Sequence, residues 1–499
     1  GYIVETYERA SQKNMNQSSP ASINNTTNTK DNKYWKNFNI SDNGYLVIAQ
    51  NQVHWQTKEP IHDPQYFNEL ANATYNTKYN RISMGGSPNL PNKVIRNGKV
   101  LKDHLGNELI LPVYQERDEV RAVWISTVWN MDLARYTNEK QYKNEIIKTL
   151  NHIESLKFNT VFFQVRPMND AFYPSKLAPY SRFIKGTEGA APDFDILRFV
   201  IDEAHKRDIE LHAWLNPYRV ATSKSGFDTI SKDNFAYKNP DLVISKNNSY
   251  ILNPGETRVQ QYIQDVINEI ITNYKDIDGI HFDDYFYIKT FGEDSSSPDY
   301  QTYLVNKEAN ETIADFRRRS VNTVIKNIFE LIEDFNAKNN KSVKFGVAPT
   351  GIWRNGIKFG GSVTAGQEHY SDLYADTKKW VKEGWLHYIM PQLYWPFDKF
   401  NSAGNPVAPF ANLVHWWNDT VDGTEVSFII GQGFYRLDGS DWEYEHELVE
   451  QLRYIQQFKN VKGVSIFTYN TFNSNLDTIQ NSIADLTTNY WTQKVKPTW

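Results

Sequence analysis

Cysteine is absent from all 499 positions of the sequence. Disulfide bonds, thiolate metal sites and cysteine nucleophiles are therefore excluded. This absence suits many cytosolic chains, but it also suits secreted or surface proteins of bacteria that avoid unpaired thiols, so it is weak evidence about location. Histidine is scarce as well, with 11 residues, which leaves little material for a histidine-rich metal centre.

A strong charge of one sign and long apolar runs are also missing. The formal net charge is −5 and the chain has no basic block, so a nucleic-acid partner gains little support. No stretch approaches the ~18 apolar residues of a membrane span, and no apolar core of a secretion signal is present. The chain begins at Gly1 rather than at methionine, which is compatible with removal of a targeting segment or lipid anchor. No pattern sets the oligomeric state.

The composition is that of a large globular protein, with 40% hydrophobic and 14% aromatic residues. Residues 1–33 are rich in Asn, Ser and Thr and predict a flexible segment. Residues 34–115 predict a partly β accessory region, because "KVIRNGKVLKDHLGNELILPVY" places Asn-Gly and Gly-Asn turns between apolar runs. We expect a catalytic domain over residues 116–485 and a C-terminal tail over 486–499.

From Val120 onward the sequence pattern changes, and short β-rich runs alternate with amphipathic helical segments. The runs are "RAVWIST" (121–127), "TVFFQVR" (160–166), "ELHAWLNPY" (210–218), "GIHFDDY" (279–285), "KFGVAPT" (344–350), "HYIMPQLYW" (387–395), "SFIIGQGFY" (427–435) and "GVSIFTYN" (463–470). This alternation predicts an α/β fold, a (β/α)₈ TIM barrel with an N-terminal extension. A doubly wound open sheet is the structural alternative, since sequence does not prove closure.

The runs begin apolar and end polar or aromatic, as expected where strand ends build the mouth of a barrel. Trp124 and Phe163 lie earlier in their runs, and we expect them in the core. Amides, an arginine and aromatic rings at such a mouth suit a neutral polar ligand such as a sugar. The candidate substrate-binding residues are Gln164, Arg166, Trp214, Asn216, His281, Tyr285, Trp353, Gln392, Tyr394, Trp395 and Tyr469.

The fourth run ends in two adjacent carboxylates, Asp283 and Asp284. A salt-bridged or helix-capping pair is the structural alternative, but glycosidic cleavage commonly uses two carboxyl groups. Strand alternation places Asp283 inward, as nucleophile or as stabiliser of positive charge, with Asp284 orienting it or donating the proton. The fifth run ends without an acid, so the further catalytic candidate is Glu368 in the long segment that follows it.

Several longer motifs resemble one family. "RAVWISTVWN", "NTVFFQVRPMNDAFYPSKLAPYS", "AWLNPYR", "DGIHFDDYF", "GVAPTGIWRN", "YIMPQLYW" and "GQGFY" are similar, in order, to glycosyl-hydrolase-like family ten over roughly Glu119 to Asn475. The resemblance implies a cofactor-free glycoside hydrolase at the bacterial cell surface or outside the cell. Its implied substrate is peptidoglycan glycan strands of GlcNAc and MurNAc without stem peptides. It also implies that Asp283, Asp284, Arg166, Asn216 and Gln392 line the site.

Two other functions remain open from the sequence. A metal-dependent polysaccharide deacetylase could use His212, His281, Asp283 and Asp284, although the first run lacks the paired histidines usual in barrel metallohydrolases. A non-catalytic carbohydrate-binding barrel is the other alternative. "DGIHFDDY" also looks like a degenerate chitinase pattern in which His281 and Tyr285 replace two acids, so catalysis assisted by an N-acetyl group is in doubt. We expect no bound metal.

Overall fold

The computed structural model describes residues 39–40, 46–47, 92–289 and 291–499. Eight parallel strands close into one barrel, and the two strands that would be the edges of an open sheet, β7 and β17, pair with each other. All eight predicted runs contain a barrel strand, so the TIM-barrel prediction is confirmed and the open sheet is excluded. The strands are β7 (Val120–Ile125), β8 (Thr160–Arg166), β9 (Glu210–Leu215), β13 (Gly279–Phe282), β14 (Lys344–Val347), β15 (Tyr388–Ile389), β16 (Ser427–Gln432) and β17 (Val461–Ile466).

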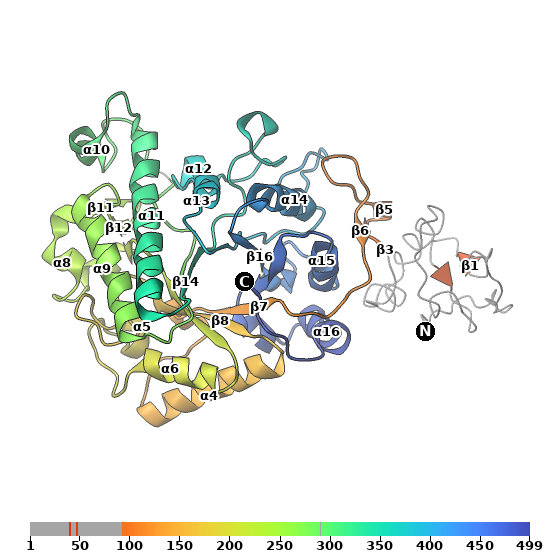
Figure 1. Cartoon of the computed structure of the whole chain (residues 1–499), viewed down its shortest axis with the longest axis horizontal. Helices are drawn as coiled ribbons and strands as arrows, with labels where there is room; N and C mark the ends of the chain where they lie inside the picture. Colours follow the sequence, from red (N-terminus) through yellow and green to blue (C-terminus); the bar gives the residue numbers. More distant parts are fainter. Residues whose placement is uncertain (1–38, 41–45, 48–91, 290) are drawn as a thin grey trace.

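Helices surround the strands on all sides, as Figure 1 shows. Asn138, Asp195 and Thr312 accept hydrogen bonds from the first turns of α4, α6 and α11, which fixes where these helices begin. The main outer helices are α4 (Glu139–Ser155), α6 (Ile196–His205), α9 (Thr257–Asn273), α11 (Ile313–Asn339), α13 (Thr377–Glu383), α14 (Phe410–Val421), α15 (Glu447–Ile455) and α16 (Asp477–Asp485). No described helix is long and apolar enough to cross a membrane.

Large side chains fill the barrel itself, so it is a packed core rather than a channel. Trp124 is buried there, and Phe163 is buried in the layer between strands and helices, as expected for both. The residues of the inner cluster are Val120, Ala122, Trp124, Phe162, Trp214, Ala348, Tyr388, Met390, Tyr394 and Ile429. The mouth therefore lies above a rigid floor of aromatic rings.

Long insertions follow the strands at the mouth. After β9 the chain forms a three-stranded antiparallel sheet of β10 (Arg219–Ala221), β12 (Ser249–Leu252) and β11 (Val243–Lys246), with the short helices α7 (Lys224–Asp228) and α8 (Phe235–Lys238). After β7 it forms the 3₁₀ turn η3 (Val128–Asn130), and after β14 it passes through α12 (His369–Asp372). These insertions supply the walls of the candidate site.

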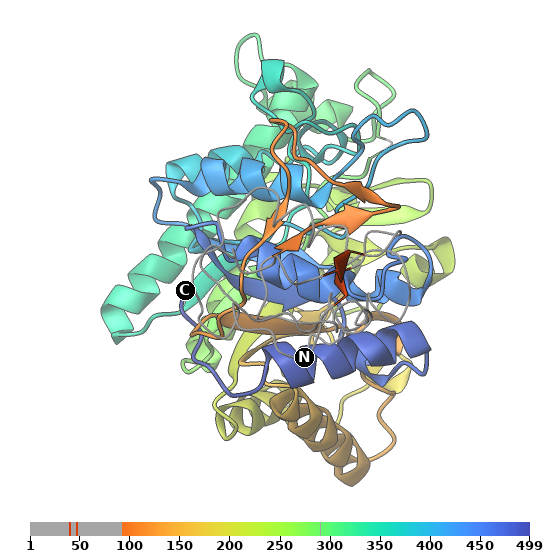
Figure 2. The same ribbon diagram turned by 90° about the vertical axis from the view of Figure 1, so that its right-hand side faces the viewer.

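In the accessory region, β1 (Asn39–Ile40) pairs antiparallel with β2 (Leu46–Val47). Residues 92–115 contain two further antiparallel ladders, β3 (Asn92–Lys93) with β6 (Ile110–Leu111) and β4 (Ile95–Arg96) with β5 (Lys99–Val100). Asn97 and Gly98 both have positive φ, as the predicted Asn-Gly turn requires. Figures 1 and 2 show the ladders of residues 92–115 against the side of the barrel near α15. Buried Arg96 holds them there through Glu447 and Glu450, each at 3.0 Å. The predicted flexible segment 1–33 and most of 34–91 lie outside the described residues.

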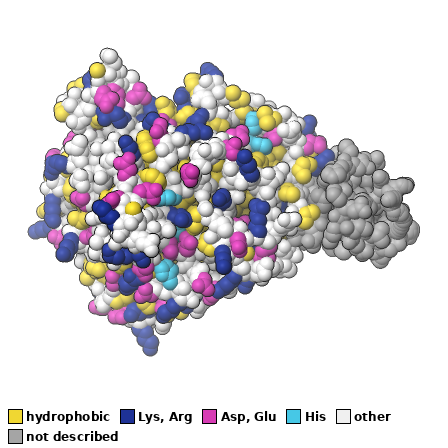
Figure 3. Space-filling model, viewed as in Figure 1, with side chains coloured by type: hydrophobic (Ala, Val, Ile, Leu, Met, Phe, Trp, Pro, Cys, Tyr) yellow, Lys and Arg dark blue, Asp and Glu magenta, His cyan; other side chains and the backbone are white. Residues whose placement is uncertain are grey.

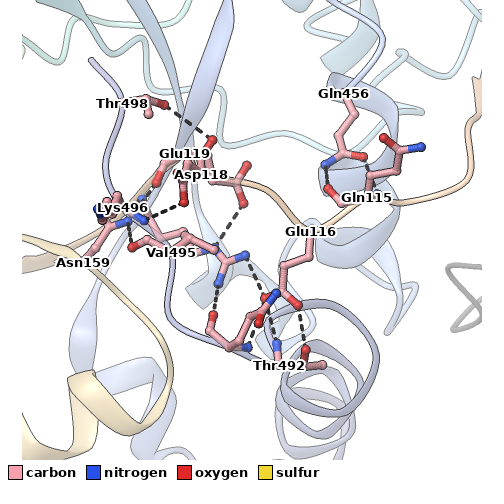
Figure 4. Close-up of polar contacts among 12 residues, drawn as sticks. Gln115, Glu116, Asp118, Glu119, Asn159, Gln456, Thr492, Val495, Lys496 and Thr498 are labelled. Carbon is pink, nitrogen blue, oxygen red and sulfur yellow. Dashed lines mark hydrogen bonds and ion pairs between the residues drawn. The ribbon is translucent and has the colours of Figure 1, made fainter.

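The C-terminal segment is docked on the barrel, although the sequence indicated only a tail. Leu486, Tyr490 and Trp491 are buried, and the following residues run beside the segment that leads into β7 (Figure 4). Glu116 Oε1 accepts a hydrogen bond from Thr492 Oγ1 at 2.6 Å, and the Glu119 amide donates to the Lys496 carbonyl at 3.0 Å. This segment therefore belongs structurally to the barrel domain.

The surface carries charges of both signs. On the face shown in Figure 3, basic and acidic side chains are interspersed.

Candidate active site

The two adjacent aspartates occupy the end of β13 and face different surroundings. Asp283 is 5% exposed, and its Oδ2 accepts a hydrogen bond of 3.0 Å from Trp214 Nε1 of the barrel interior. Its Oδ1 accepts a longer one, 3.3 Å, from the Tyr285 amide. Both carboxylate oxygens of Asp283 are thus oriented by the strand ends, and the side chain points inward as strand alternation predicts.

Asp284 is half-buried and lies on the wall of a cavity of about 360 Å³. Its Oδ1 accepts a hydrogen bond of 3.0 Å from Gln392 Nε2, and the same Gln392 nitrogen donates to the Ala348 carbonyl at 2.8 Å. The end of the sixth barrel strand therefore fixes this carboxylate. Of the two aspartates, Asp284 is the one with direct access to a molecule in the cavity.

The surroundings raise the pKa values of both carboxyl groups. Burial and, to a smaller extent, the neighbouring Asp284 raise the pKa of Asp283 to about 7, although Arg219 and the Trp214 hydrogen bond oppose the shift. Burial also raises the pKa of Asp284, against the hydrogen bond from Gln392. Because the two groups interact, they titrate as a pair. The pair can therefore hold one proton near neutral pH, as acid catalysis requires.

The remaining cavity wall combines amide, hydroxyl and aromatic side chains with aliphatic ones and two cations. Asn216 is fully buried; its Oδ1 accepts from the Arg219 amide at 3.0 Å, and its Nδ2 has no hydrogen-bond partner among the described residues. Tyr285 is 51% exposed, and the proximity of Asp284 is the largest cause that raises its pKa. Lys289 is exposed at the rim. Of the predicted residues, Asn216, Tyr285 and Asp284 meet around this cavity.

Sequence reasoning missed Arg219, which lines the cavity, and Asp132, which joins two loops. Arg219 donates to the Pro167 carbonyl at 2.8 and 3.0 Å, and its guanidinium lies 5.4 Å from the centre of the Tyr285 ring. Asp132 accepts from the Ser126 amide at 2.7 Å and the Asn470 amide at 2.8 Å, which ties together the loops after β7 and β17. Burial raises its pKa to about 6. Arg219 stands at the end of the "AWLNPYR" motif, so its motif was the available signal.

Gln164 and Arg166, at the end of β8, support the neighbouring loops. Gln164 Oε1 accepts from the Thr127 and Val128 amides at 2.9 and 3.0 Å, so it holds the turn that follows β7. Arg166 is 1% exposed and donates to Asn169 in the loop after its own strand. The expectation that both contact a sugar does not fit these positions, because their polar groups are buried among loop residues.

His281 is a core residue, which corrects its assignment to substrate binding. It is fully buried, and its Nε2 accepts a hydrogen bond of 3.0 Å from Trp124 Nε1. Its Nδ1 lies 2.9 Å from the Tyr388 hydroxyl, and the ring stacks on Phe162 at 4.2 Å. Burial holds the pKa of His281 well below its usual range. Alternation correctly gave the side of the strand, but His281 lies one layer below the mouth.

The two aromatic residues after Gln392 pack more deeply than expected. Tyr394 is 8% exposed, belongs to the inner cluster and stacks on Phe467 at 5.7 Å. Trp395 is half-buried and packs against the cluster between strands and helices, where Gly351 leaves room for its ring. Tyr394 is near enough to Asp284 for that charge to contribute to its raised pKa. Neither ring is among the residues that line the cavity at Asp284.

Three further candidates hydrogen-bond to other parts of the fold and do not line the cavity at Asp284. Trp353 Nε1 donates to Asp376 at 2.9 Å, and its ring stacks on Trp416. The Tyr469 hydroxyl lies 2.9 Å from His152 Nδ1 on α4. Glu368 accepts from the Asn355 amide at 2.7 Å and from Ser371 Oγ at 2.6 Å, and no hydrogen bond among the described residues joins it to either aspartate. These contacts correct the three assignments, since each polar group already stabilises a loop or helix.

Metal coordination gains no support from the donor geometry. Within the part of the chain that the structure describes, no three His, Cys, Asp or Glu side chains are grouped so as to hold a metal ion. His281 has both ring nitrogens in hydrogen-bond contact, and His212 lies in the interior with Nε2 3.0 Å from Glu210. The arrangement instead resembles a pair of carboxyl groups for proton transfer and charge stabilisation.

Known proteins are similar in sequence to this chain. The family model described as Glycosyl hydrolase-like 10 matches residues 119–448. Glycosyl hydrolase YngK of Bacillus subtilis (strain 168) is 37% identical over 379 residues, which cover 74% of this chain and 72% of that protein. Glycosyl hydrolase DigH of Escherichia coli (strain K12) is 34% identical over 379 residues, covering 71% and 83%.

Among solved structures, the glycoside hydrolase domain of PgaB (BpsB) from Bordetella bronchiseptica is similar, with a TM-score of 0.45 and 11% identity over 75% of this chain and 99% of that one. At this level the likeness adds nothing about the site. The family match covers most of the barrel, and YngK is similar along nearly three quarters of the chain. The chain therefore belongs to the glycosyl hydrolase-like 10 family.

Proposed function

We propose that the protein is a glycoside hydrolase that cleaves peptidoglycan glycan strands lacking stem peptides, at the bacterial cell surface or outside the cell. The observation that carries this proposal is the Asp283–Asp284 pair, because Asp284 lines a cavity with amide, hydroxyl and aromatic side chains and the buried Asp283 lies directly beside it. Membership of the family supports glycosidase chemistry, and the substrate is the part that needs testing.

Each aspartate receives a role from its environment. Asp284 reaches the cavity and donates a proton to the oxygen of the scissile glycosidic bond. Asp283 lies beneath it, held by Trp214. When the proton of the pair resides on Asp284, Asp283 is ionised, and its negative charge stabilises the positive charge that develops at the anomeric carbon. Because Gln392, after the sixth barrel strand, donates a hydrogen bond to Asp284, that carboxyl group is held in place before substrate binds.

The charges around the cavity support a strand without stem peptides. Removal of the peptide leaves a free carboxylate on the lactyl group of each MurNAc. Arg219 and exposed Lys289 both line the cavity and can pair with such an anion, whereas an amide-linked peptide would remove that charge. The hydroxyl and amide groups of the wall serve the neutral GlcNAc units.

A comparison of three substrates tests the proposal. Purified strands that carry peptides, peptide-free strands, and peptide-free strands with the lactyl carboxylate converted to an amide are incubated with the protein, and new reducing ends are counted. We expect the peptide-free strands to be cleaved fastest, and Lys289→Gln to raise KM for them more than for the amidated strands. Binding without new reducing ends would identify a non-catalytic sugar-binding barrel instead.

A further inference from the structure

Trp129 is a large aromatic side chain that the fold holds in the open. It lies in η3, just after β7, and is 60% exposed. Single exposed apolar residues are common on protein surfaces, so exposure alone says little. Here, however, the residue also has a backbone conformation that tryptophan rarely adopts, with φ 56° and ψ 19°. Such left-handed geometry is strained in a residue with a bulky side chain.

The surroundings of Trp129 maintain this conformation. Asn130 has positive φ as well, and its Nδ2 donates to the Leu133 and Phe183 carbonyls at 3.1 and 2.7 Å. Gln164 Oε1 accepts from the two amides before Trp129, at 2.9 and 3.0 Å. The Phe183 ring supports the indole edge-on at 5.1 Å. The turn is therefore fixed from both sides with the indole directed outward, which is the arrangement of a preorganised ligand platform.

Trp129 also lines a second cavity, of about 340 Å³. Ala221 and Thr222, at the end of β10, line both this cavity and the one at Asp284, so the two are neighbours across that strand end. Besides the indole, the second cavity is lined by Ser223, Ser225 and Thr229, by Arg182, and by the apolar side chains of Met168, Phe183 and Val220. An aromatic face beside several hydroxyls suits a sugar ring, which offers C–H groups on its face and hydroxyls at its edge.

We propose that Trp129 is the platform of an additional sugar-binding subsite, so that a glycan strand bound at Asp284 continues across the end of β10 onto the indole. The occupant is thus a further part of the same strand. This inference rests on the proposed function for the identity of the sugar. It predicts that long strands bind more tightly than short ones and that cleavage occurs within strands.

The experiment measures how affinity depends on strand length. Calorimetric titration with peptide-free strands of four and eight sugars is carried out in an Asp284→Asn background, so that the strands stay intact. Trp129→Asn is the test variant, because asparagine tolerates positive φ and keeps the turn while removing the ring. Trp129→Tyr retains a ring. Tyr237→Ala is the matched control, since Tyr237 on α8 is 51% exposed and lines neither cavity.

We expect Trp129→Asn to reduce the ratio of eight-sugar to four-sugar affinity by about tenfold, the order expected for one lost aromatic stacking contact. Trp129→Tyr should recover part of that ratio, and Tyr237→Ala should leave it unchanged. An unchanged ratio in Trp129→Asn overturns the subsite. Failure of the wild-type protein to cleave any strand would overturn the proposed function instead, and because affinity is measured separately, the two failures are distinguishable.

Discussion

Replacement of Asp283 by asparagine is expected to stabilise the fold while it removes the chemistry. The folded-state pKa of about 7 lies roughly 3 units above the ordinary value of 3.8, because the carboxyl group is 5% exposed and next to Asp284. At about 1.4 kcal/mol per unit, the buried charge destabilises the protein by up to ~4 kcal/mol once it is fully ionised. For a domain of roughly 400 residues this corresponds to about 5 °C in Tm.

The sign and pH range of this effect follow from the direction of the shift. Below about pH 4 the Asp283 carboxyl group is largely protonated in both the folded and the unfolded protein, so it does not lower the free energy of unfolding. As the pH rises toward 7, the unfolded state loses this proton more readily than the folded state, and the free energy of unfolding falls. Asparagine has the same shape, can accept the Trp214 hydrogen bond and does not ionise. The variant and the wild type should therefore have about the same free energy of unfolding near pH 4, and the variant should have the higher one at pH 8.

Urea denaturation followed by tryptophan fluorescence at pH 4, 6 and 8 measures the difference. Asp228→Asn is the control, because Asp228 is an exposed partner of Lys224 and its loss should change stability by less than about 1 kcal/mol at each pH. Activity on glycan strands is measured in parallel. A variant less stable than the wild type at pH 8, or a gain that is the same at all three pH values, would refute the reasoning about a buried charge.

Three further predictions follow from individual contacts. Activity should be bell-shaped in pH, with a fall above about pH 7 as the aspartate pair loses its shared proton; a rate that rises steadily to pH 9 would contradict this. Gln392→Ala removes the hydrogen bond that lowers the pKa of Asp284, so the alkaline limb of the profile should move upward, and a downward shift would contradict the assignment. Arg317→Ala should destabilise the fold by about 3–5 kcal/mol in urea denaturation, because it leaves Asp299 buried and unpaired, whereas loss of the more exposed Arg198 should cost under about 1 kcal/mol.

The barrel could be predicted from the sequence because apolar strand-like runs and amphipathic helical segments alternate regularly along the chain. Parallel strands buried on both faces read as apolar runs, and all eight runs contain strands, although β15 spans only Tyr388–Ile389. Alternation along β13 also gave the inward direction of Asp283 correctly. The Asn-Gly turn at Asn97 was predictable for the same reason, since only local chemistry decides it.

The sequence pattern did not indicate how deeply each side chain lies in the barrel or how the long loops fold. Alternation puts His281 and Asp283 on the same side of a strand, but it does not say which lies at the mouth and which in the packed layer below. The position of Glu368 depends on how a long insertion folds back on Asn355. Trp129 depends on two consecutive residues with positive φ, a conformation that the side chains themselves disfavour. These features arise from tertiary contacts rather than from local sequence pattern.

The release of new reducing ends from peptide-free glycan strands, compared between the wild-type protein and Asp284→Asn, tests the central claim most directly. Products identified by mass spectrometry give the rate, and circular dichroism shows whether the variant is folded. The account predicts cleavage by the wild type and a loss of about 10³-fold or more in kcat for a folded variant, which corresponds to about 4 kcal/mol of transition-state stabilisation. A folded Asp284→Asn protein that cleaves strands at close to the wild-type rate would contradict it.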